Sequence, residues 1–320
     1  MLRLALHKSK IGQIRLNVAY VQFFLSCALA GGNYVAAKYL GQELAPLTGA
    51  ALRFMLASAC LMPWMLLQER RPSRATLPHL PTLFVLGLTG IFGFNALLFL
   101  GLQQTTASNA SLISATLPMM VALLAIPLLR ERVGRPQVMG ILLSFVGVVY
   151  LVGRGSLTNI VELRLNPGDL LIIGATMCSA LYTIIGRRIV SLMSPLSVVA
   201  WATSAGAMLM VLFALLDPAW HSVDRLTPSG LIALLYMATL GSVVVQILWY
   251  RGLAHIEATK ASIFTNVTPL STLLWASALL GERLSIYVFI TVPIVLSGVF
   301  LVSRGKAHQT DARSTILFPE

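Results

Sequence analysis

The stretches "GLQQTTASNASLISATLPMMVALLAIPLLRER" (residues 101–132) and "GLAHIEATKASIFTNVTPLSTLLWASALLGER" (residues 252–283) decide the fold, because each is an altered copy of the other. At a constant offset of 151 residues, both begin with Gly-Leu, both carry a proline at the same place (Pro118 and Pro269), and both end in Glu-Arg. A register without gaps over this length indicates an internal repeat.

The repeat extends beyond these two stretches in both directions. Further matches at the same offset are Gly90 with Gly241, Asn95 with Gln246, and Gly147 with Gly298. At an offset of 149, the starts of the two halves also align, pairing Asn33 with Tyr182, Lys38 with Arg187, and Pro46 with Pro195. We therefore predict two homologous halves, residues 1–154 and 155–305, followed by a tail at residues 306–320.

The composition of the chain places both halves in a membrane. Hydrophobic residues make up 57% of the chain and charged residues 11%, with a mean hydropathy of +0.83, whereas soluble domains average about 25% charged residues. Apolar runs recur at the length of roughly 20 residues that a helix needs to cross a bilayer. The predicted spans cover about residues 18–40, 46–67, 81–102, 108–129, 136–153, 169–187, 195–216, 228–250, 259–280 and 286–303.

The Lys and Arg residues between the spans predict the orientation of the chain. With the N-terminus in the cytoplasm, 17 of them fall on the cytoplasmic side and 4 on the other, so both termini are expected inside a plasma (inner) membrane. Five spans in each half make the second half insert upside down. The predicted fold is all-α and polytopic, with ten transmembrane helices in two inverted five-helix repeats, an architecture typical of transporters.

Polar side chains inside the spans are the candidate substrate-cavity residues. Arg53 in hydrocarbon costs about 2.5 kcal/mol or more unless it faces protein or water. It therefore either lines a cavity for an anionic group, such as a substrate carboxylate, or is structural and reaches the interface or binds backbone carbonyls. The amides of Asn33, Asn95, Gln246 and Asn266 are expected to face the bundle interior, where they line a cavity or form interhelical hydrogen bonds.

Aromatic, glycine and proline residues complete the candidate list. Tyr182 and Trp275 lie deep enough in their spans to stack on a substrate, although such residues also form interfacial belts. Gly32, next to Asn33, allows close helix approach or exposes backbone to a cavity. Pro118 and Pro269 each remove a backbone hydrogen bond and favour a kink, which shapes a gate or simply serves packing.

The predicted spans lack acidic and histidine residues at their centres, which argues against an enzyme or a metal-binding protein. All eleven acidic residues and all five histidines fall at span ends, in loops or in tails, so neither a catalytic acid–base pair nor a metal site is expected. The basic residues form no face with interleaved aromatics, which argues against nucleic-acid binding. We expect no enzyme activity, no cofactor and no metal; an intramembrane enzyme remains a weaker alternative, because it needs a mid-span cluster of reactive side chains.

Four short motifs carry a resemblance to a known family. They are "NYVAAK" (Asn33–Lys38), "LRF" (Leu52–Phe54), "ATLP…LLRER" (Ala115–Arg132) and "NVTPLSTLL…LLGER" (Asn266–Arg283). Together they resemble the EamA-like family of the drug/metabolite transporter superfamily. The resemblance implies a ten-helix bundle with a central cavity that moves small metabolites, often exporting amino acids. One departure is that Leu29-Ala30 stands where family members often carry a tryptophan before the glycine.

The function that we expect is export of a small metabolite, such as an amino acid or a related compound, by alternating access. An importer or an exchanger of another metabolite, for example a nucleotide-linked one, is the alternative on the same fold. The expected partners are a small-molecule substrate and the lipid bilayer, and a homodimer is left open.

Overall fold

The computed structural model describes residues 2–69, 77–105, 110, 113–152, 166–216, 226–281 and 286–304, and all regular secondary structure within them is helical. The first half contains α1 (Leu2–Leu40), α2 (Pro46–Glu69), η1 (Leu77–His79), α3 (Leu80–Leu86), η2 (Gly87–Gly93), α4 (Phe94–Leu102), α6 (Leu117–Leu129) and α7 (Arg135–Val152). The second contains α9 (Pro167–Ile189), α10 (Pro195–Leu215), α11 (Pro228–Ala238), η4 (Thr239–Val244), α12 (Val245–Leu253), α13 (Ala258–Ser262), η5 (Ile263–Asn266), α14 (Val267–Leu280) and α15 (Ile286–Arg304).

Six of these helical units are long and apolar enough to cross a bilayer, which makes the chain a multi-pass membrane protein. They are Leu16–Leu40, Pro46–Glu69, Leu77–Leu102, Pro167–Ile189, Pro195–Leu215 and Pro228–Leu253. Three further apolar helices in the described residues are shorter, at Leu117–Leu129, Arg135–Tyr150 and Phe289–Ser303. The total of ten transmembrane helices therefore stays a prediction. The boundary at 154/155 and the tail at 306–320 lie outside the described residues.

Local sequence signals explain where several helices begin. Pro46, Pro167, Pro195 and Pro228 open α2, α9, α10 and α11, positions at which the missing N–H of proline costs nothing. The side chains of the preceding residues cap three of these helices by accepting a backbone N–H: Asn166 from Asp169, Ser194 from Ser197, and Thr227 from Gly230. These caps fix the ends of long helices at the edges of the apolar region.

The two halves repeat one another in the structure, down to irregular features. The π-helices η2 and η4 occupy equivalent places in the third unit of each half, at Gly87–Gly93 and Thr239–Val244. The helices α6 and α14 both end in a left-handed residue, Arg130 at φ 54° and Gly281 at φ 65°, and these positions are 151 residues apart. This agreement confirms the repeat that the sequence predicts.

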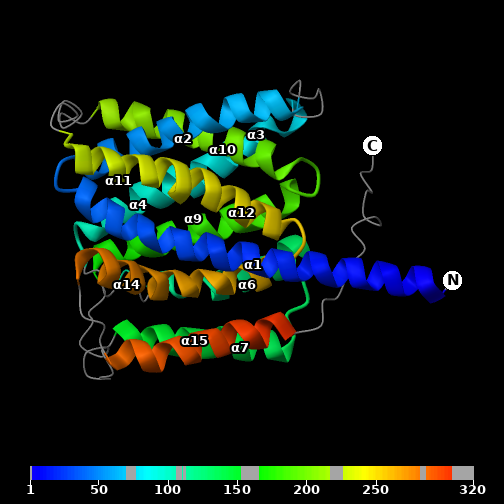
Figure 1. Ribbon diagram of the computed structural model, residues 1–320. Helices are drawn as coiled ribbons and strands as arrows, with labels where there is room; N and C mark the ends of the chain where they lie inside the picture. The colour runs from blue at the N-terminus through cyan, green and yellow to red at the C-terminus, as the bar shows by residue number, and fades with distance from the viewer. Residues whose placement is uncertain are drawn as a thin grey trace.

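Equivalent helices of the two halves pack antiparallel against each other at both extremes of the bundle. Figure 1 shows α2 beside α10 at the top and α7 beside α15 at the bottom. Ser144 lies against Gly298, and Gly147 lies against Val295, so residue numbers rise along α7 as they fall along α15. The two halves are therefore related by a two-fold axis that runs across the helices.

The packing exchanges helices between the halves. Helix α1 packs against α11, α12 and α14 of the other half, and α9 packs against α3, α4 and α6. Two mixed groups result: an α1 group of α1, α2, α11, η4, α12 and α14, and an α9 group of α9, α10, α3, η2, α4 and α6. The two groups contact each other along α2 and α10, and α7 and α15 form a separate pair. Short α13 connects α12 to α14 and packs against α6 and α9 of the α9 group.

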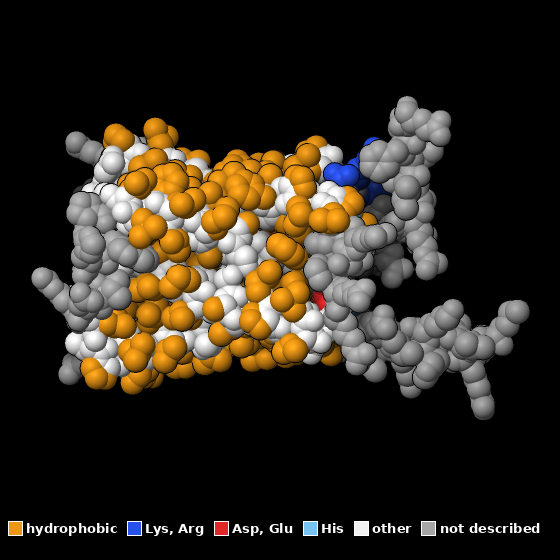
Figure 2. Space-filling view, turned by 90° about the horizontal axis from the view of Figure 1, so that it is seen from above, with side chains coloured by type: hydrophobic (Ala, Val, Ile, Leu, Met, Phe, Trp, Pro, Cys, Tyr) orange, Lys and Arg blue, Asp and Glu red, His pale blue; other side chains and the backbone are white. Residues whose placement is uncertain are grey.

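The surface of the bundle is apolar around its sides. Figure 2 shows hydrophobic side chains covering the visible flank and Lys and Arg gathered at one end. At that end, α1 begins and α15 ends (Figure 1). We call it the base, and the other end the rim. An apolar flank with charge at one end is what a membrane-spanning bundle requires.

Candidate functional site

Arg53 of α2 lies against the π-helix η4 of the other half. Its Nε donates a hydrogen bond to Ser242 Oγ at 2.7 Å, and its Nη2 donates to the carbonyl of Gly241 at 3.1 Å. The guanidinium also lies 4.8 Å from the centre of the Phe54 ring. Because these contacts hold it inside the bundle, Arg53 does not extend to the membrane interface.

The π-helix explains why a backbone carbonyl is available to Arg53. In η4 the hydrogen-bond pattern widens to i→i+5, and Ser242 Oγ itself donates to the carbonyl of Met237, five residues earlier, at 2.8 Å. The carbonyl of Gly241 then accepts from two side chains, Arg53 and, at 2.9 Å, Asn33 Nδ2 of α1. Three elements, α1, α2 and η4, therefore meet at one backbone oxygen.

Asn33 fills a socket that exists because residue 241 is glycine. A Cβ at position 241 would overlap the side-chain amide of Asn33. The other amide atom, Asn33 Oδ1, is buried and has no hydrogen-bond partner in the described part of the chain. An unpaired buried acceptor costs free energy, and this oxygen is the atom of Asn33 that packs most closely against Gly241.

The cluster is accessible on the side of Tyr34. The side chain of Tyr34 is 57% exposed, and its phenol lies within electrostatic range of the partly buried Arg53. The partners of Arg53 are a hydroxyl, a carbonyl and aromatic rings, and no carboxylate among the described residues pairs with it. Its positive charge is therefore not compensated within the site, which favours an anionic ligand.

Tyr182 and Gln246 form a second cluster related to the first by the repeat. Tyr182 OH donates to Gln246 Oε1 at 2.7 Å, and its ring fills a socket at Gly90, where a Cβ would overlap it. The ring of Tyr250 packs edge-on against that of Tyr182 at 5.4 Å. Tyr182 is the equivalent of Asn33 and Gly90 of Gly241, so the same side-chain-into-glycine contact occurs twice. Tyr182 is buried and not exposed.

The other amide candidates lie apart from the Arg53 cluster. Asn95 Nδ2 donates to the carbonyl of Ile91 at 2.6 Å within its own helix. Asn266 Nδ2 donates to Ser144 Oγ at 2.5 Å and thereby joins η5 to α7. Both side chains are buried. They therefore satisfy backbone and interhelical hydrogen bonds.

Gly32 and Trp275 lie in the contact between α1 and its neighbours. A Cβ at Gly32 would overlap the hydroxyl of Tyr236, which donates to the carbonyl of Leu29 at 2.9 Å. Trp275 Nε1 donates to the carbonyl of Ala28 at 2.9 Å. These contacts hold α1 close to α11 and α14, one turn away from Asn33.

The candidate gate prolines begin helices. Pro118 lies in the first turn of α6, and Pro269 lies in the first turn of α14, directly after the 3₁₀ segment η5. Proline has no N–H to donate to the carbonyl four residues earlier, and its ring clashes with that carbonyl. The irregular backbone therefore precedes each proline, where the sequence suggested a kinked continuous span.

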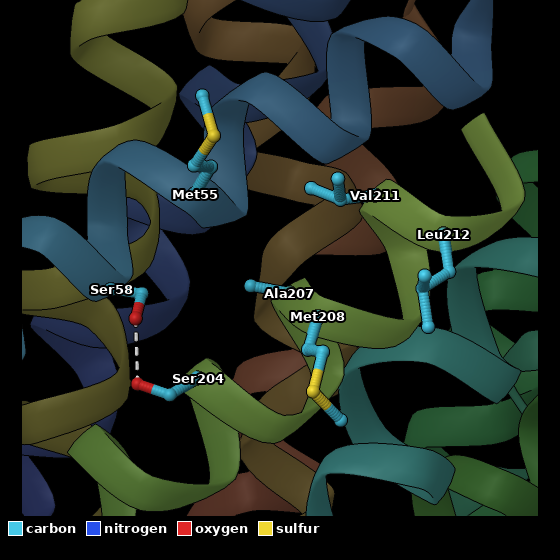
Figure 3. Close-up of a pocket in the computed structure, with 7 residues that line it drawn as sticks. All are labelled: Met55, Ser58, Ser204, Ala207, Met208, Val211 and Leu212. Carbon is cyan, nitrogen blue, oxygen red and sulfur yellow. Dashed lines mark hydrogen bonds between the residues drawn. The ribbon is translucent and has the colours of Figure 1, made fainter. Parts of the chain in front are cut away.

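A separate groove lies between α2 and α10. Figure 3 shows its seven lining residues, which enclose about 310 Å³: Met55, Ser58, Ser204, Ala207, Met208, Val211 and Leu212. Ser58 and Ser204 share a hydrogen bond of 2.6 Å at one side of it. Met55 and Met208 are exposed on the flank, and the lining carries no charge, so the groove lacks the recognition chemistry of the Arg53 cluster.

Sequence reasoning missed three members of the Arg53 cluster. The sequence pairs Gly241 with Gly90 in the repeat, but it does not mark Gly241 as a site residue. It does not mark Tyr34 either, although Tyr34 directly follows the candidate Asn33. Ser242 gave no signal, because small polar residues are common in membrane helices. Among the described residues, no three His, Cys, Asp or Glu side chains gather closely enough to hold a metal ion.

Comparison with known proteins gives matches over nearly the whole chain. The profile of the EamA-like transporter family matches residues 17–153 and 166–304. The uncharacterized transporter YyaM of Bacillus subtilis (strain 168) is 32% identical over 93% of this chain and 98% of its own. An uncharacterized transporter of Archaeoglobus fulgidus is 31% identical over 89% of this chain and 96% of its own.

Two further matches are more distant. An S-adenosylmethionine/S-adenosylhomocysteine transporter of Chlamydia trachomatis (serovar L2) is 27% identical over 92% of this chain and 91% of its own. A solved structure, titled only as the crystal structure of a protein, superposes with a TM-score of 0.74 at 20% identity, over 88% of this chain and 95% of that one. This last likeness supports the fold alone.

Proposed function

The chain belongs to the EamA-like transporter family, and we propose that it exports a small metabolite with an anionic group, such as an amino acid or a related compound. The observation that carries the proposal is the Arg53 cluster. The Arg53 guanidinium is held by neutral partners inside the bundle, and no described carboxylate neutralises it. Such a group binds an anionic solute more favourably than a cationic or a neutral one.

The name of one of these relatives is consistent with this substrate class. The Chlamydia relative is named for S-adenosylmethionine and S-adenosylhomocysteine, and both of these molecules end in an α-amino acid. The shared chemistry is a carboxylate beside an amine. In the present chain, Arg53 would bind the carboxylate.

The proposed mechanism is alternating access between two inverted halves. We place the base in the cytoplasm because the Lys and Arg residues of the loops favour that side. The antiparallel packing of α2 with α10 and of α7 with α15 supports an inverted repeat. The α1 group and the α9 group would rock against each other about the central Arg53, and both termini would be cytoplasmic.

A transport and binding assay with purified protein tests the role of Arg53. Protein in proteoliposomes is challenged with a panel of labelled amino acids, S-adenosyl compounds and organic acids. Replacing Arg53 by Met removes the charge and keeps the length, so we expect the KM for an anionic substrate to rise by about tenfold or more, the size of one lost charge-assisted hydrogen bond. The matched control is Arg188→Met, because Arg188 is exposed at the end of α9.

The same assay separates export from the alternatives. Uptake that needs substrate preloaded in the vesicle would favour an exchanger. In vesicles whose protein is inserted with the base inside, accumulation of substrate from outside would favour an importer. If Arg53→Met and the wild type transport every substrate of the panel with the same KM, Arg53 does not bind the anionic group and the substrate proposal fails.

A further inference from the structure

Two carboxylates at the base link the two halves, one between α2 and α10 and the other between α6 and α13, the short helix that connects α12 to α14 of the α1 group. Glu69, at the end of α2, accepts hydrogen bonds from Ser194 and Ser197 at the start of α10. Glu131, just after α6, accepts from the backbone N–H of Ala258 at 2.7 Å and from Thr259 through both its N–H (3.1 Å) and its hydroxyl (2.8 Å). A carboxylate at a helix start gains charge-assisted hydrogen bonds and the helix dipole.

An ion pair lies beside the Glu131 tie. Lys260 Nζ is 3.2 Å from Glu257 Oε2, and the Lys260 side chain is only 3% exposed. The same Glu257 oxygen accepts from Gln137 Nε2 of α7 at 3.2 Å. Arg187, near the end of α9, lies within electrostatic range of both Glu131 and Glu257. The base of the bundle thus holds interacting charges from α6, from α9 and from the segment at α13.

Helix packing shows the same closure at the base. Helix α9 packs against α12 through Tyr182 and Tyr250, and a Cβ at Gly186 would overlap Tyr250. The repeat-equivalent pair, α1 and α4, makes no comparable contact in the described residues. Tyr34 is 57% exposed, whereas its repeat equivalent Thr183 is 3% exposed. The bundle is open beside α1 and closed at the corresponding place beside α9.

The described ties at the rim stay within one group. Glu43, between α1 and α2, accepts from the N–H of Thr227 at 2.8 Å and from its hydroxyl at 2.5 Å, at the start of α11. Asp169 of α9 accepts from Thr105, just after α4. Both ties join helices of the same group, so they would persist while the groups move.

The repeat shows that the charges at the base are only partly matched at the rim, where Lys38 is the equivalent of Arg187. The equivalents of Glu69, Glu257 and Lys260 are Pro218, Thr106 and Asn109, all uncharged, whereas Glu131 has the charged equivalent Glu282. These four equivalents lie outside the described residues. The difference is therefore read from the sequence alone.

We propose that Glu69, Glu131, Glu257 and Lys260 form the gate at the base of the transporter, and that their charge makes the base-closed, rim-open arrangement its resting state. The inference rests on the proposed alternating access. Two inverted halves of identical sequence would populate the two mirrored states equally, because neither state would have an interaction that the other lacks. Unequal charges at the two ends remove this equality and favour closure where the charges lie.

The test replaces base charges with the residues that stand at the equivalent rim positions. A background with Cys27, Cys60 and Cys178 changed to Ala carries one reporter, Thr183→Cys, which is buried while the base is closed. The double variant Glu257→Thr with Lys260→Asn is added, which removes both charges of the pair together. In nanodiscs we expect it to raise the labelling rate by a membrane-impermeant maleimide by about fivefold, the effect of one or two weak ties on a two-state equilibrium.

Two controls keep the outcome interpretable. Glu43→Gln weakens a tie of the rim that lies within one group, and it should leave the labelling of Thr183→Cys unchanged. Glu131→Gln, which keeps an acceptor oxygen but not the charge, provides a second gate variant if the double variant does not fold. Elution as a single peak and full labelling after denaturation show that each variant is folded and contains the reporter.

Three results would overturn the inference. One is fast labelling of Thr183→Cys without a gate variant, a second is labelling that both gate variants leave unchanged, and a third is an equal rise with Glu43→Gln. The readout needs no substrate. Labelling that follows the gate variants in a protein that transports nothing from the panel would therefore keep the gate and reject the proposed substrate.

Discussion

The carbonyl of Gly241 is the point at which the candidate site is assembled. It accepts hydrogen bonds from Asn33 and Arg53, which come from two different helices of the first half. An anionic ligand at Arg53 would compete with this carbonyl for the guanidinium. Ligand binding would therefore loosen the contact between α2 and η4, which links recognition to movement of the helices.

The sequence indicates which residues of the site are unusual in a membrane span, but not which atoms they bind. Arg53 and Asn33 stand out because charged and amide side chains are costly in lipid. The sequence left open whether Arg53 lines a cavity or is structural, reaching the interface or binding backbone carbonyls. The structure shows a bond to the Gly241 carbonyl, and binding of a ligand by Arg53 stays a prediction. Ser242 could not be identified, since its role depends on a π-turn that changes which carbonyl faces α2.

At the residue scale, Arg130 makes a prediction about stability. It ends α6 at φ 54°, a left-handed conformation that costs a non-glycine residue about 1 kcal/mol or more. Its repeat equivalent is Gly281, at φ 65°. We expect Arg130→Gly to stabilise the protein by about 0.5–1 kcal/mol, measured as a rise in the midpoint of thermal unfolding in detergent.

Arg132→Gly is the matched control for this change. Arg132 is also an exposed arginine of the same loop, and it is not among the residues with positive φ. The two variants lose the same charge. Equal midpoints for both would show that the left-handed conformation at Arg130 carries no strain.

At the scale of elements, the glycine of each π-helix is matched to a side chain of the other half. Gly241 receives Asn33, and Gly90 receives Tyr182. Adding a Cβ at position 241 overfills the contact, so we expect Gly241→Ala to destabilise the protein by about 1–3 kcal/mol. Combining it with Asn33→Ala removes the overlapping amide and should restore most of the midpoint of thermal unfolding.

Gly134→Ala serves as the control, because a Cβ there meets its nearest atom at 3.6 Å, an ordinary contact. A midpoint for Gly241→Ala equal to that of Gly134→Ala would mean that the socket is not filled as described. If the double variant Gly241→Ala with Asn33→Ala is no more stable than Gly241→Ala alone, the destabilisation does not come from overlap with the Asn33 amide.

Long apolar elements follow from hydropathy more surely than breaks within them. The predicted spans at 46–67 and 195–216 correspond closely to α2 (Pro46–Glu69) and α10 (Pro195–Leu215). The span predicted at 259–280 is instead divided into α13, η5 and α14. A window average cannot show this division, because the hydrophobicity does not change where the backbone does.

At the scale of the whole molecule, the exchange of helices joins the two halves. The repeat in sequence predicts two halves, but it does not predict that α1 packs mainly on the second half and α9 on the first. Hydropathy and repeats indicate which segments span the membrane and which are equivalent. They do not indicate which helices pack against each other.

This exchange predicts the behaviour of a cut chain. A protease site inserted between residues 153 and 165, then cleaved in the folded protein, should leave the two halves eluting together from a size-exclusion column. The reason is that neither packed group is complete without helices from both halves. As a control, the cleaved protein is denatured before loading, and there the halves should separate.

Two halves that elute apart after native cleavage would contradict the packing. Coelution with a lowered unfolding midpoint would still agree with it, since the cut removes a covalent link but not the contacts.

The contact between α7 and α15 has an implication for the origin of the chain. Ser144 meets Gly298, and their repeat equivalents Val295 and Gly147 meet in turn. This reciprocity is the mark of an isologous interface, which two identical subunits form about a two-fold axis. The protein thus has the architecture of a fused homodimer. Two copies of one such half, inserted into a membrane in opposite orientations, would form the same contact without a covalent link.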